Sequence, residues 1–166
     1  MKLKDKIISL AVMLLMIGLD QLTKYWALTD LRGRPPVELW KNVFHFVYAE
    51  NRGAAFSILQ NRRIFLIIFT AVAIGAVLYV VFSGRMKLNK MATLGLTLIA
   101  AGGIGNLIDR IFRSFVVDFI YFVPIDFPVF NVADSCVTIG AIVFGVGFIV
   151  AEVRRAKAAK QPAQEE

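Results

Sequence analysis

Residues 91–111 read MATLGLTLIAAGGIGNLIDRI, a long apolar run that ends in a short polar cluster. A helix needs about 20 predominantly apolar residues to cross a bilayer, so this run predicts a membrane-spanning helix. Working outward from it, three further runs qualify, at residues 7–28, 64–82 and 132–151. The sequence therefore predicts an all-α integral membrane protein with four transmembrane helices.

The overall composition supports this fold class. The chain has 166 residues, of which 58% are hydrophobic and 19% are charged, and its mean hydropathy is +0.67. A soluble domain averages nearer ~45–50% apolar and ~25% charged. A core of this length cannot bury that many apolar residues, which excludes a soluble enzyme and a disordered protein.

The net charge of +7 comes from residues at the edges of the apolar runs, which argues for membrane topology and against nucleic acid as a partner. Lys and Arg are enriched at the N-terminus, between residues 83 and 90, and in the tail at 153–166. By the positive-inside tendency, both termini are expected in the cytoplasm. The first run resembles a secretory signal peptide but lacks a small-residue cleavage site, so we interpret it as a retained span. Residues 1–152 are then a single membrane domain, followed by a basic cytoplasmic tail.

The two segments expected outside the cell, residues 29–63 and 112–131, are unusually apolar for linkers. In the first, Phe44, Phe46 and Tyr48 alternate with other residues, which predicts a short strand with one apolar face. In the second, Pro124 and Pro128 forbid a regular helix. Both loops are expected to lie on the outer membrane surface and to cover a site that accepts lipid.

Ionisable residues inside a membrane are costly and are functional candidates by default. Asp20 and Lys24 stand four apart on the first span and can form a structural ion pair. Asp118 is flanked by Val, Val, Phe and Ile, an apolar setting that gives a structural carboxylate little reason to be there. Asp134 opens the fourth span, where it could also be a plain N-cap. Because one loop joins Asp118 to Asp134, that loop can bring both carboxylates to one place.

Polar residues near these carboxylates complete the candidate site. Asn106, Asp109 and Arg110 stand three or four apart at the outer end of the third span, where Asp109 and Arg110 could simply form its polar end. Gly102 precedes them, and small residues allow a neighbouring helix or a substrate backbone to come close. Other candidates lie in the loops, where they could instead satisfy backbone groups; these are Asn51 and Asn131.

Two carboxylates that share an apolar site cannot both ionise easily, so one pKa rises while the other stays low. The ionised member can take a proton from water while the protonated member polarises a carbonyl, as in aspartic proteases. This chemistry needs no cofactor and no metal. It suits a chain whose one histidine, His45, and one cysteine, Cys136, are expected to be packing residues.

Five motifs in this order and spacing resemble the lipoprotein signal peptidases (signal peptidase II). The resemblance covers the chain from the first span to the fourth, and the combination is far more specific than any one motif. The motifs are Asp20-x-x-x-Lys24, Asn51-Arg52-Gly53-Ala54-Ala55-Phe56, Gly105-Asn106-Leu107-Ile108-Asp109-Arg110, Val116-Val117-Asp118-Phe119-Ile120 and Phe130-Asn131-Val132-Ala133-Asp134.

The resemblance implies an intramembrane aspartic endopeptidase of the bacterial inner membrane, with its site near the outer face. Its substrates would be prolipoproteins, cleaved just before a cysteine that bears a diacylglyceryl group. It implies that Asp118 and Asp134 are the catalytic dyad and that Asp20 and Lys24 are mainly structural. It also implies a small outer β-element, a covering helix in the first outer loop, and inhibition by cyclic peptide antibiotics. Residues expected to bind substrate are Asn51, Gly102, Asn106, Arg110 and Asn131.

Other functions remain open at this point. In a Ser/Lys peptidase, Lys24 would activate Ser57 or Ser135, although Asp20 would keep that lysine protonated. A small ion or proton carrier would use the same carboxylates as a relay, but it would need charges through the full membrane depth. A purely structural subunit would not explain the buried carboxylates. A carboxylate metal site is a poor fit because no histidine sits at ligand spacing.

Overall fold

The computed structural model describes residues 2–53, 59, 62–86 and 88–159, and its largest elements are four long helices. By length and hydropathy, each of the four could cross a membrane. This confirms the predicted fold class. The helices are α1 (Leu3–Trp26), α2 (Arg63–Ser83), α3 (Lys90–Phe112) and α4 (Val132–Ala159).

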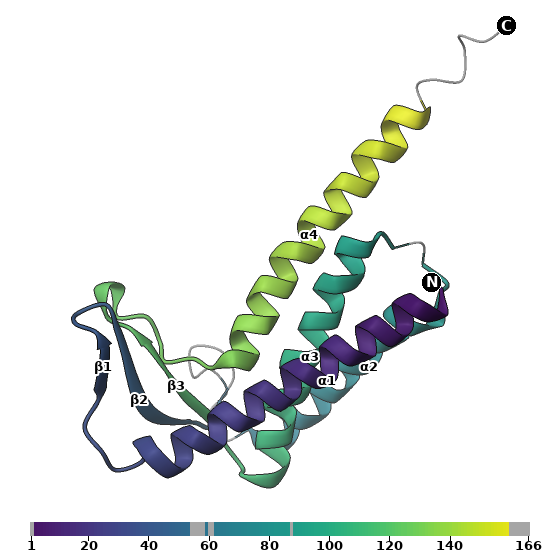
Figure 1. The fold of residues 1–166 in the computed structure, drawn as a ribbon. Helices are drawn as coiled ribbons and strands as arrows, with labels where there is room; N and C mark the ends of the chain where they lie inside the picture. Colours follow the sequence, from purple (N-terminus) through teal and green to yellow (C-terminus); the bar gives the residue numbers. More distant parts are fainter. Residues whose placement is uncertain (1, 54–58, 60–61, 87, 160–166) are drawn as a thin grey trace, which may run out of the picture.

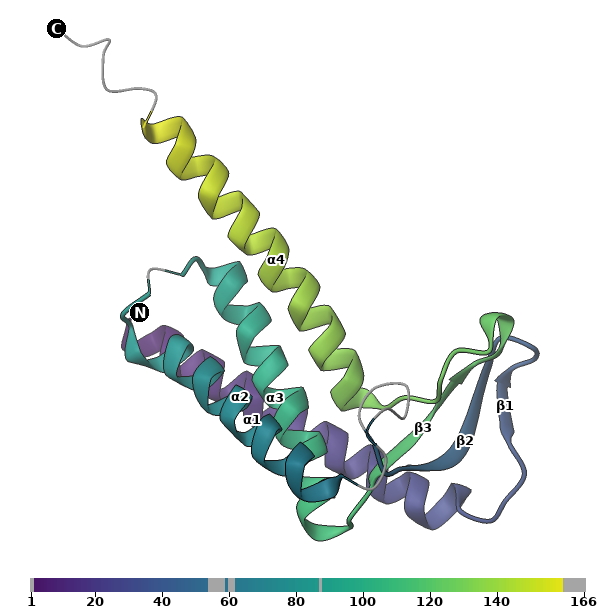
Figure 2. The same cartoon turned by 180° about the vertical axis from the view of Figure 1, so that it is seen from behind.

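Helix α3 is the centre of the bundle and packs against each of the other three helices, as Figures 1 and 2 show from opposite sides. Its contact with α4 depends on glycine. A Cβ at Gly102 would overlap the backbone oxygen of Ala133, and one at Gly140 would lie 2.7 Å from the backbone oxygen of Gly95. Since small residues let helix backbones approach closely, these glycines let α4 pack tightly along α3, from the first turn of α4 at Ala133 to Gly140.

Three antiparallel strands lie at one end of the bundle in the order β1-β2-β3 (Figure 1). Strand β2 (Phe44–Asn51) confirms the strand predicted from the alternation at Phe44 to Tyr48. Strand β1 (Val37–Trp40) was not predicted from the sequence, nor was β3 (Val116–Phe122) in the second outer loop. The sequence did not reveal β3 because its first four residues are all buried, so its side chains lack the apolar–polar alternation of a half-buried strand.

A small apolar core joins the sheet to the end of α1 and so positions β3. Ala27 and Leu31, in a wider helical turn after α1, pack with Val117 and Phe119. The ring of Trp26 meets that of Phe119 edge to face, with 6.0 Å between centroids. Successive strand residues point to opposite faces. With Val117 and Phe119 held in this core, Asp118 between them is directed to the other face of β3.

The first and last helices extend beyond the spans that were predicted from the sequence. Helix α1 begins at Leu3, before the predicted span, and α4 continues into the basic segment as far as Ala159. A continuous helix is reasonable there because Arg and Lys are good helix formers. The predicted tail after residue 160, and most of the covering helix implied for the first outer loop, lie outside the described residues.

Candidate active site

Asp118 and Asp134 are brought together through Asn131, which lies in the return from β3 to α4. The side-chain amide of Asn131 donates to Asp118 Oδ1 at 2.6 Å, and its backbone N–H donates to Asp134 Oδ2 at 3.2 Å. In return, the backbone N–H of Asp134 donates to Asn131 Oδ1 at 2.9 Å. One buried asparagine therefore contacts both carboxylates and caps the first turn of α4.

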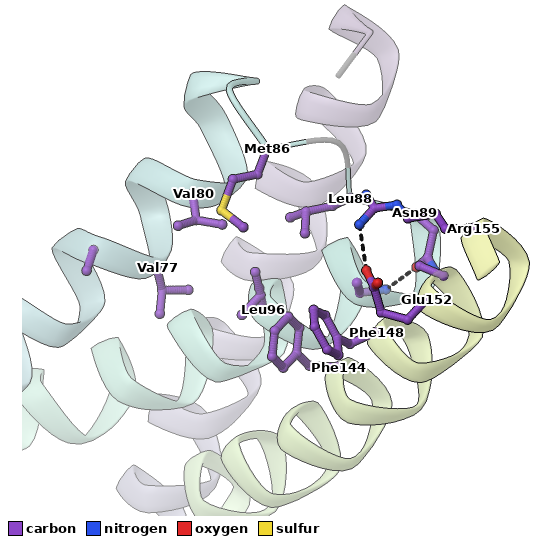
Figure 3. Close-up of a pocket in the computed structure, with 13 residues that line it drawn as sticks. Val77, Val80, Met86, Leu88, Asn89, Leu96, Phe144, Phe148, Glu152 and Arg155 are labelled. Atoms are coloured by element: carbon purple, nitrogen blue, oxygen red, sulfur yellow. Dashed lines mark hydrogen bonds and ion pairs between the residues drawn. The ribbon is translucent and has the colours of Figure 1, made fainter. Parts of the chain in front are cut away.

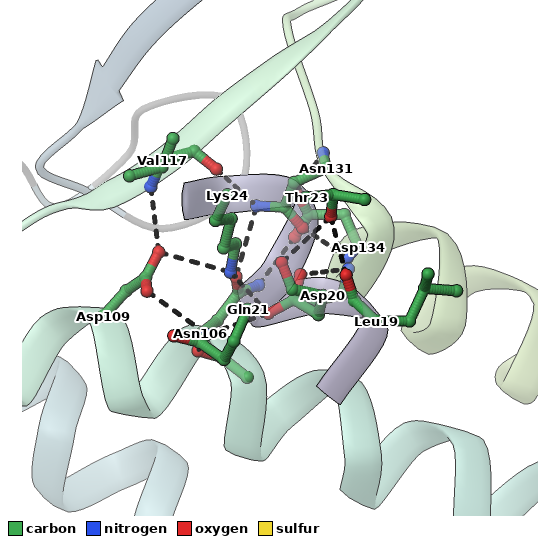
Figure 4. A network of polar contacts seen from close by, with 12 residues as sticks. Leu19, Asp20, Gln21, Thr23, Lys24, Asn106, Asp109, Val117, Asn131 and Asp134 are labelled. Carbon is green, nitrogen blue, oxygen red and sulfur yellow. Dashed lines mark hydrogen bonds and ion pairs between the residues drawn. The ribbon is translucent and has the colours of Figure 1, made fainter. Parts of the chain in front are cut away.

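Asn106 on α3 holds Asp134 from the other side (Figure 4). Its Nδ2 donates to Asp134 Oδ1 at 2.8 Å, while its Oδ1 accepts a hydrogen bond from Lys24 Nζ at 2.8 Å. A lysine ammonium can only donate. Lys24 therefore fixes which end of the Asn106 amide is the oxygen, and so directs the Asn106 N–H groups toward Asp134.

Lys24 belongs to a buried ionic network that joins α1 and α3. Its ammonium lies 2.9 Å from Asp20 Oδ2 and 3.3 Å from Asp109 Oδ2, and all three side chains are almost completely buried. Arg113 forms an ion pair with the other oxygen of Asp109, and Gln21 donates to both carboxylates. The two carboxylates are thus matched by two cations, the arrangement in which buried charges are tolerated.

The same carboxylates position the elements that hold the dyad. Asp20 Oδ1 accepts a hydrogen bond from the backbone N–H of Ala133 at 2.9 Å, next to Asp134 in the first turn of α4. Asp109 Oδ2 accepts one from the backbone N–H of Val117 at 3.0 Å, next to Asp118 in β3. Each carboxylate of the network therefore binds the backbone beside one member of the dyad.

Arg110 and Asn51 lie at the edge of this cluster. Arg110 donates to the backbone oxygen of Gly53 at 2.8 Å, and the side chain of Asn51 accepts from the backbone N–H of Gly53 at 2.9 Å. Arg63, at the start of α2, donates to the backbone oxygens of Arg110 and Ile111, which satisfies the end of α3. The chain that follows β2 is thereby tied to the C-terminal end of α3; residues 54–56 of its motif lie outside the described residues.

The pKa of Asp118 is raised from 3.8 to about 7, first by burial and then by the negative charge of Asp134. The amides of Asn51 and Asn131 and the charge of Lys24 act in the opposite direction. A carboxyl group with this pKa still holds a proton for much of the time at neutral pH. The site therefore contains a proton donor next to a second carboxylate, which is the arrangement that acid–base hydrolysis requires.

The structure also bears on other sequence candidates. Gly102 lies in the contact between α3 and α4, so the close approach that it allows is that of a helix. Ser135 donates to the backbone oxygen of Asn131 at 3.0 Å, whereas Lys24 is surrounded by Asp20, Asp109 and Asn106. This arrangement disfavours a Ser/Lys pair at Ser135, and Ser57 lies outside the described residues.

Two residues of the network, Gln21 and Arg113, were not singled out from the sequence. Asp109 was considered with its neighbour Arg110, but its partners are Lys24 and Arg113. Spacing gave one usable signal, because Asp109 and Arg113 stand four apart on one helix face. Gln21 gave no signal of its own, since its contacts with α3 join residues far apart in the chain.

The fold places the chain in a known class of bacterial membrane enzymes. Two solved bacterial membrane enzymes share the fold. One has a TM-score of 0.79 at 30% identity and covers 96% of this chain and 94% of its own. The other has a TM-score of 0.76 at 32% identity and covers 85% of this chain and 92% of its own.

The family follows from sequence comparison. The family model for signal peptidase (SPase) II matches residues 12–150. The lipoprotein signal peptidase of Streptococcus thermophilus (strain CNRZ 1066) is 43% identical over 78% of this chain and 84% of its own length. That of Streptococcus pneumoniae (strain ATCC BAA-255 / R6) is 41% identical over 91% and 98%. The chain therefore belongs to the signal peptidase II family and is a bacterial membrane peptidase.

Proposed function

We propose that this peptidase removes signal peptides from diacylglyceryl-modified prolipoproteins by an aspartic mechanism, and that it cuts just before the lipidated cysteine. The observation on which this rests is the pairing of Asp118 with Asp134 through Asn131, in which Asp118 and Asn131 are buried and Asp134 is half-buried. Neither carboxylate forms an ion pair among the described residues. The pair can therefore exchange a proton with water and substrate.

In the proposed reaction, Asp134 accepts a proton from a water molecule whose oxygen attacks the scissile carbonyl carbon. Asp118 donates its proton to the carbonyl oxygen, which gives a neutral tetrahedral intermediate. As the C–N bond breaks, Asp134 passes its proton to the leaving amine and Asp118 recovers one from a hydroxyl group. Each carboxyl group returns to its starting state, so no metal or covalent intermediate is needed.

Lys24 is proposed to act as a positioning residue in this reaction. Its ammonium holds the oxygen of the Asn106 amide, so that the nitrogen of that amide donates to Asp134. A preorganised donor costs little reorganisation during the reaction. Asp20 and Asp109 keep Lys24 in place and are proposed to have a mainly structural role.

Substrate backbone is proposed to bind at the edge of the site, where Asn51, Arg110 and Asn131 present amide and guanidinium donors. Cyclic peptide antibiotics that inhibit the family are expected to occupy the same place. Holding the scissile bond at the dyad in this way lowers the barrier by removing the entropy cost of a chance encounter.

The site is proposed to lie at the outer surface of the inner membrane, with both termini in the cytoplasm. Exposed aromatic side chains gather at the end of the bundle that holds the dyad, including Tyr25, Trp26 and Trp40. Trp and Tyr are enriched at the membrane–water boundary. The start of α1, the α2–α3 connection and the last turns of α4, where Lys and Arg are frequent in the sequence, lie at the other end (Figure 1), as the positive-inside rule expects of a cytoplasmic face.

Cleavage of a matched pair of peptides tests the substrate class. One peptide bears a diacylglyceryl group on the cysteine after the scissile bond, and the other has an unmodified cysteine. We expect cleavage of the lipidated peptide alone, just before that cysteine, with mass spectrometry locating the cut. Equal turnover of both peptides would indicate a general membrane protease instead.

A further inference from the structure

Gln21 lies between the two carboxylates of the buried ionic network (Figure 4). Its Nε2 is 3.1 Å from Asp20 Oδ2 and 3.3 Å from Asp109 Oδ1. The same nitrogen lies 3.1 Å from the backbone oxygen of Gly105. All three of these oxygens are acceptors, so the end of the amide that faces them is the nitrogen. Gln21 therefore joins Asp20 on α1 to the carboxylate and the backbone of α3.

Arg113, the residue that ends α3, holds the other end of this amide. Its Nη1 donates to Gln21 Oε1 at 3.0 Å, and the same nitrogen forms an ion pair with Asp109 Oδ1. A guanidinium can only donate hydrogen bonds. Arg113 therefore fixes the orientation of the Gln21 amide and directs its N–H groups toward the carboxylates.

Arg113 also completes the set of donors around Asp109. The Oδ2 atom accepts from Lys24 at 3.3 Å and from the backbone N–H of Val117 at 3.0 Å. The Oδ1 atom accepts from Arg113 and from Gln21. With a cation at each oxygen, the plane of the carboxylate is fixed. Because the last torsion of an Asp side chain is soft, the bond from Asp109 to the Val117 backbone depends on the cation at the far oxygen.

These contacts link Arg113 to both members of the dyad. Asp109 binds the backbone N–H beside Asp118 in β3. Asp20, which Arg113 reaches through the amide, binds the backbone N–H beside Asp134 in the first turn of α4. Among the contacts that the described residues make, none joins Arg113 to the dyad itself, so any effect on the reaction is indirect.

From these contacts we infer that Arg113 is a positioning residue, which sets the placement of β3 relative to the first turn of α4 and so the separation of the two dyad carboxylates. The inference rests on the proposed function and adds a residue to it. Lys24 acts on the dyad through the side chain of Asn106. Arg113 acts through the backbone on each side of the site, so the two roles are separable.

The position of Arg113 at the edge of the network makes it accessible to mutation. Its side chain is 25% exposed, whereas that of Lys24 is fully buried. When Arg113 is replaced, Asp109 still has Lys24 as a buried cation. A variant at position 113 should therefore fold, and its rate can be measured per folded molecule.

Replacement of Arg113 by Met and by Lys tests the inference. Arg113→Met removes both contacts, and we expect kcat for a lipidated peptide to fall about 10- to 100-fold, because a displacement of about 1 Å can cost this much. KM should not change, because the loss falls on the transition state alone. Arg113→Lys should recover most of the activity, since one nitrogen makes both contacts and an ammonium has three donors.

Arg155→Met is the matched control. Arg155 also pairs with a carboxylate on its own helix, Glu152, but the two residues line an apolar cavity at the other end of the bundle (Figure 3). This variant should keep the wild-type kcat and KM. Two results would overturn the inference, which are a wild-type kcat per folded molecule in Arg113→Met and a loss that Arg113→Lys does not recover.

Amide hydrogen exchange locates the effect independently of activity. We expect the N–H of Val117, and to a smaller extent that of Ala133, to exchange faster in Arg113→Met than in the wild type or in Arg155→Met. Wild-type exchange at Val117 would also overturn the inference. If Asp118→Asn cleaved normally, the proposed function would fail while the exchange result still stood, which distinguishes the two claims.

Discussion

Two pairs of carboxylates lie side by side at one end of the bundle, and they differ in what neutralises them. Asp20 and Asp109 are matched by Lys24 and Arg113 and bind backbone N–H groups. Asp118 and Asp134 receive only hydrogen bonds from asparagines and one backbone N–H. A direct ion pair makes a buried carboxylate a structural group, whereas Asp118, which has no ion pair among the described residues, keeps its proton near neutral pH.

Removal of either dyad carboxylate should give the largest effect on activity. We expect Asp118→Asn and Asp134→Asn to lower kcat by about 10²–10⁴-fold, the usual contribution of a general acid or base. Thermal stability in detergent should stay at or above that of the wild type, because an amide is cheaper to bury than a charge. Cleavage of a lipidated peptide measures the first effect. Near-normal turnover by both variants would refute the dyad assignment.

Removal of Lys24 should instead cause a large loss of stability. Lys24→Met leaves Asp20 and Asp109 buried without their shared cation, and breaking a buried ion pair in this way costs about 3–5 kcal/mol. Unfolding in mixed micelles measures this loss. Lys4→Met, at an exposed lysine on the same helix, is the control and should be neutral.

The same variant separates a positioning role for Lys24 from a purely structural one. Lys24 lowers the pKa of Asp118, so its loss should move that pKa above about 7 and shift the pH–rate profile to higher pH. Folded Lys24→Met should also show a lower kcat at an unchanged KM, because Asn106 loses the donor that orients it. A profile and a kcat identical to the wild type, per folded molecule, would leave Lys24 with a structural role alone.

The pH dependence of stability gives an effect of comparable size with a definite sign. The pKa of Asp118 in the folded protein, about 7, lies above the ordinary value of 3.8. Its contribution is therefore fully present below about pH 4 and is lost as the pH rises through 7, on the order of 4 kcal/mol in total. Between pH 4 and 7 the wild type should lose stability relative to Asp118→Asn. Asp30→Asn, which removes an exposed carboxylate, should show the same pH dependence of stability as the wild type. If Asp118→Asn also shows the wild-type dependence, Asp118 is already ionised at low pH.

A substitution in the contact between α3 and α4 should have the smallest effect on stability. Gly102→Ala places a methyl group against the Ala133 carbonyl, and such overpacking costs about 1–3 kcal/mol. Gly18→Ala, where a Cβ meets nothing within 4 Å, should be neutral or slightly stabilising because alanine favours helix. Melting temperatures in detergent compare the two. Equal behaviour would mean that α3 and α4 are not held this closely.

Hydropathy and local spacing were sufficient to predict the four helices and strand β2, and they singled out Asn106 and Asn131 beside the dyad but not Gln21 or Arg113. Apolar runs and i,i+4 pairs are local patterns, so Asp20 and Lys24 could be paired from the sequence. The partners of Asp109 and the pairing of β2 with β3 could not be predicted, because both join segments far apart in the chain. The raised pKa of Asp118 likewise depends on burial and on Asp134, and it arises only after folding.

Infrared titration of the dyad tests the central claim most directly, because a protonated carboxyl group has its own C=O band. We expect the wild type to show a carboxyl group that titrates near pH 7, lost in Asp118→Asn. In Asp134→Asn the band should remain but titrate at lower pH, since the charge of Asp134 raises the pKa of Asp118. A wild-type spectrum with no carboxyl group titrating between about pH 5 and 8, or a band that survives Asp118→Asn unchanged, would contradict the claim that these two aspartates share a proton.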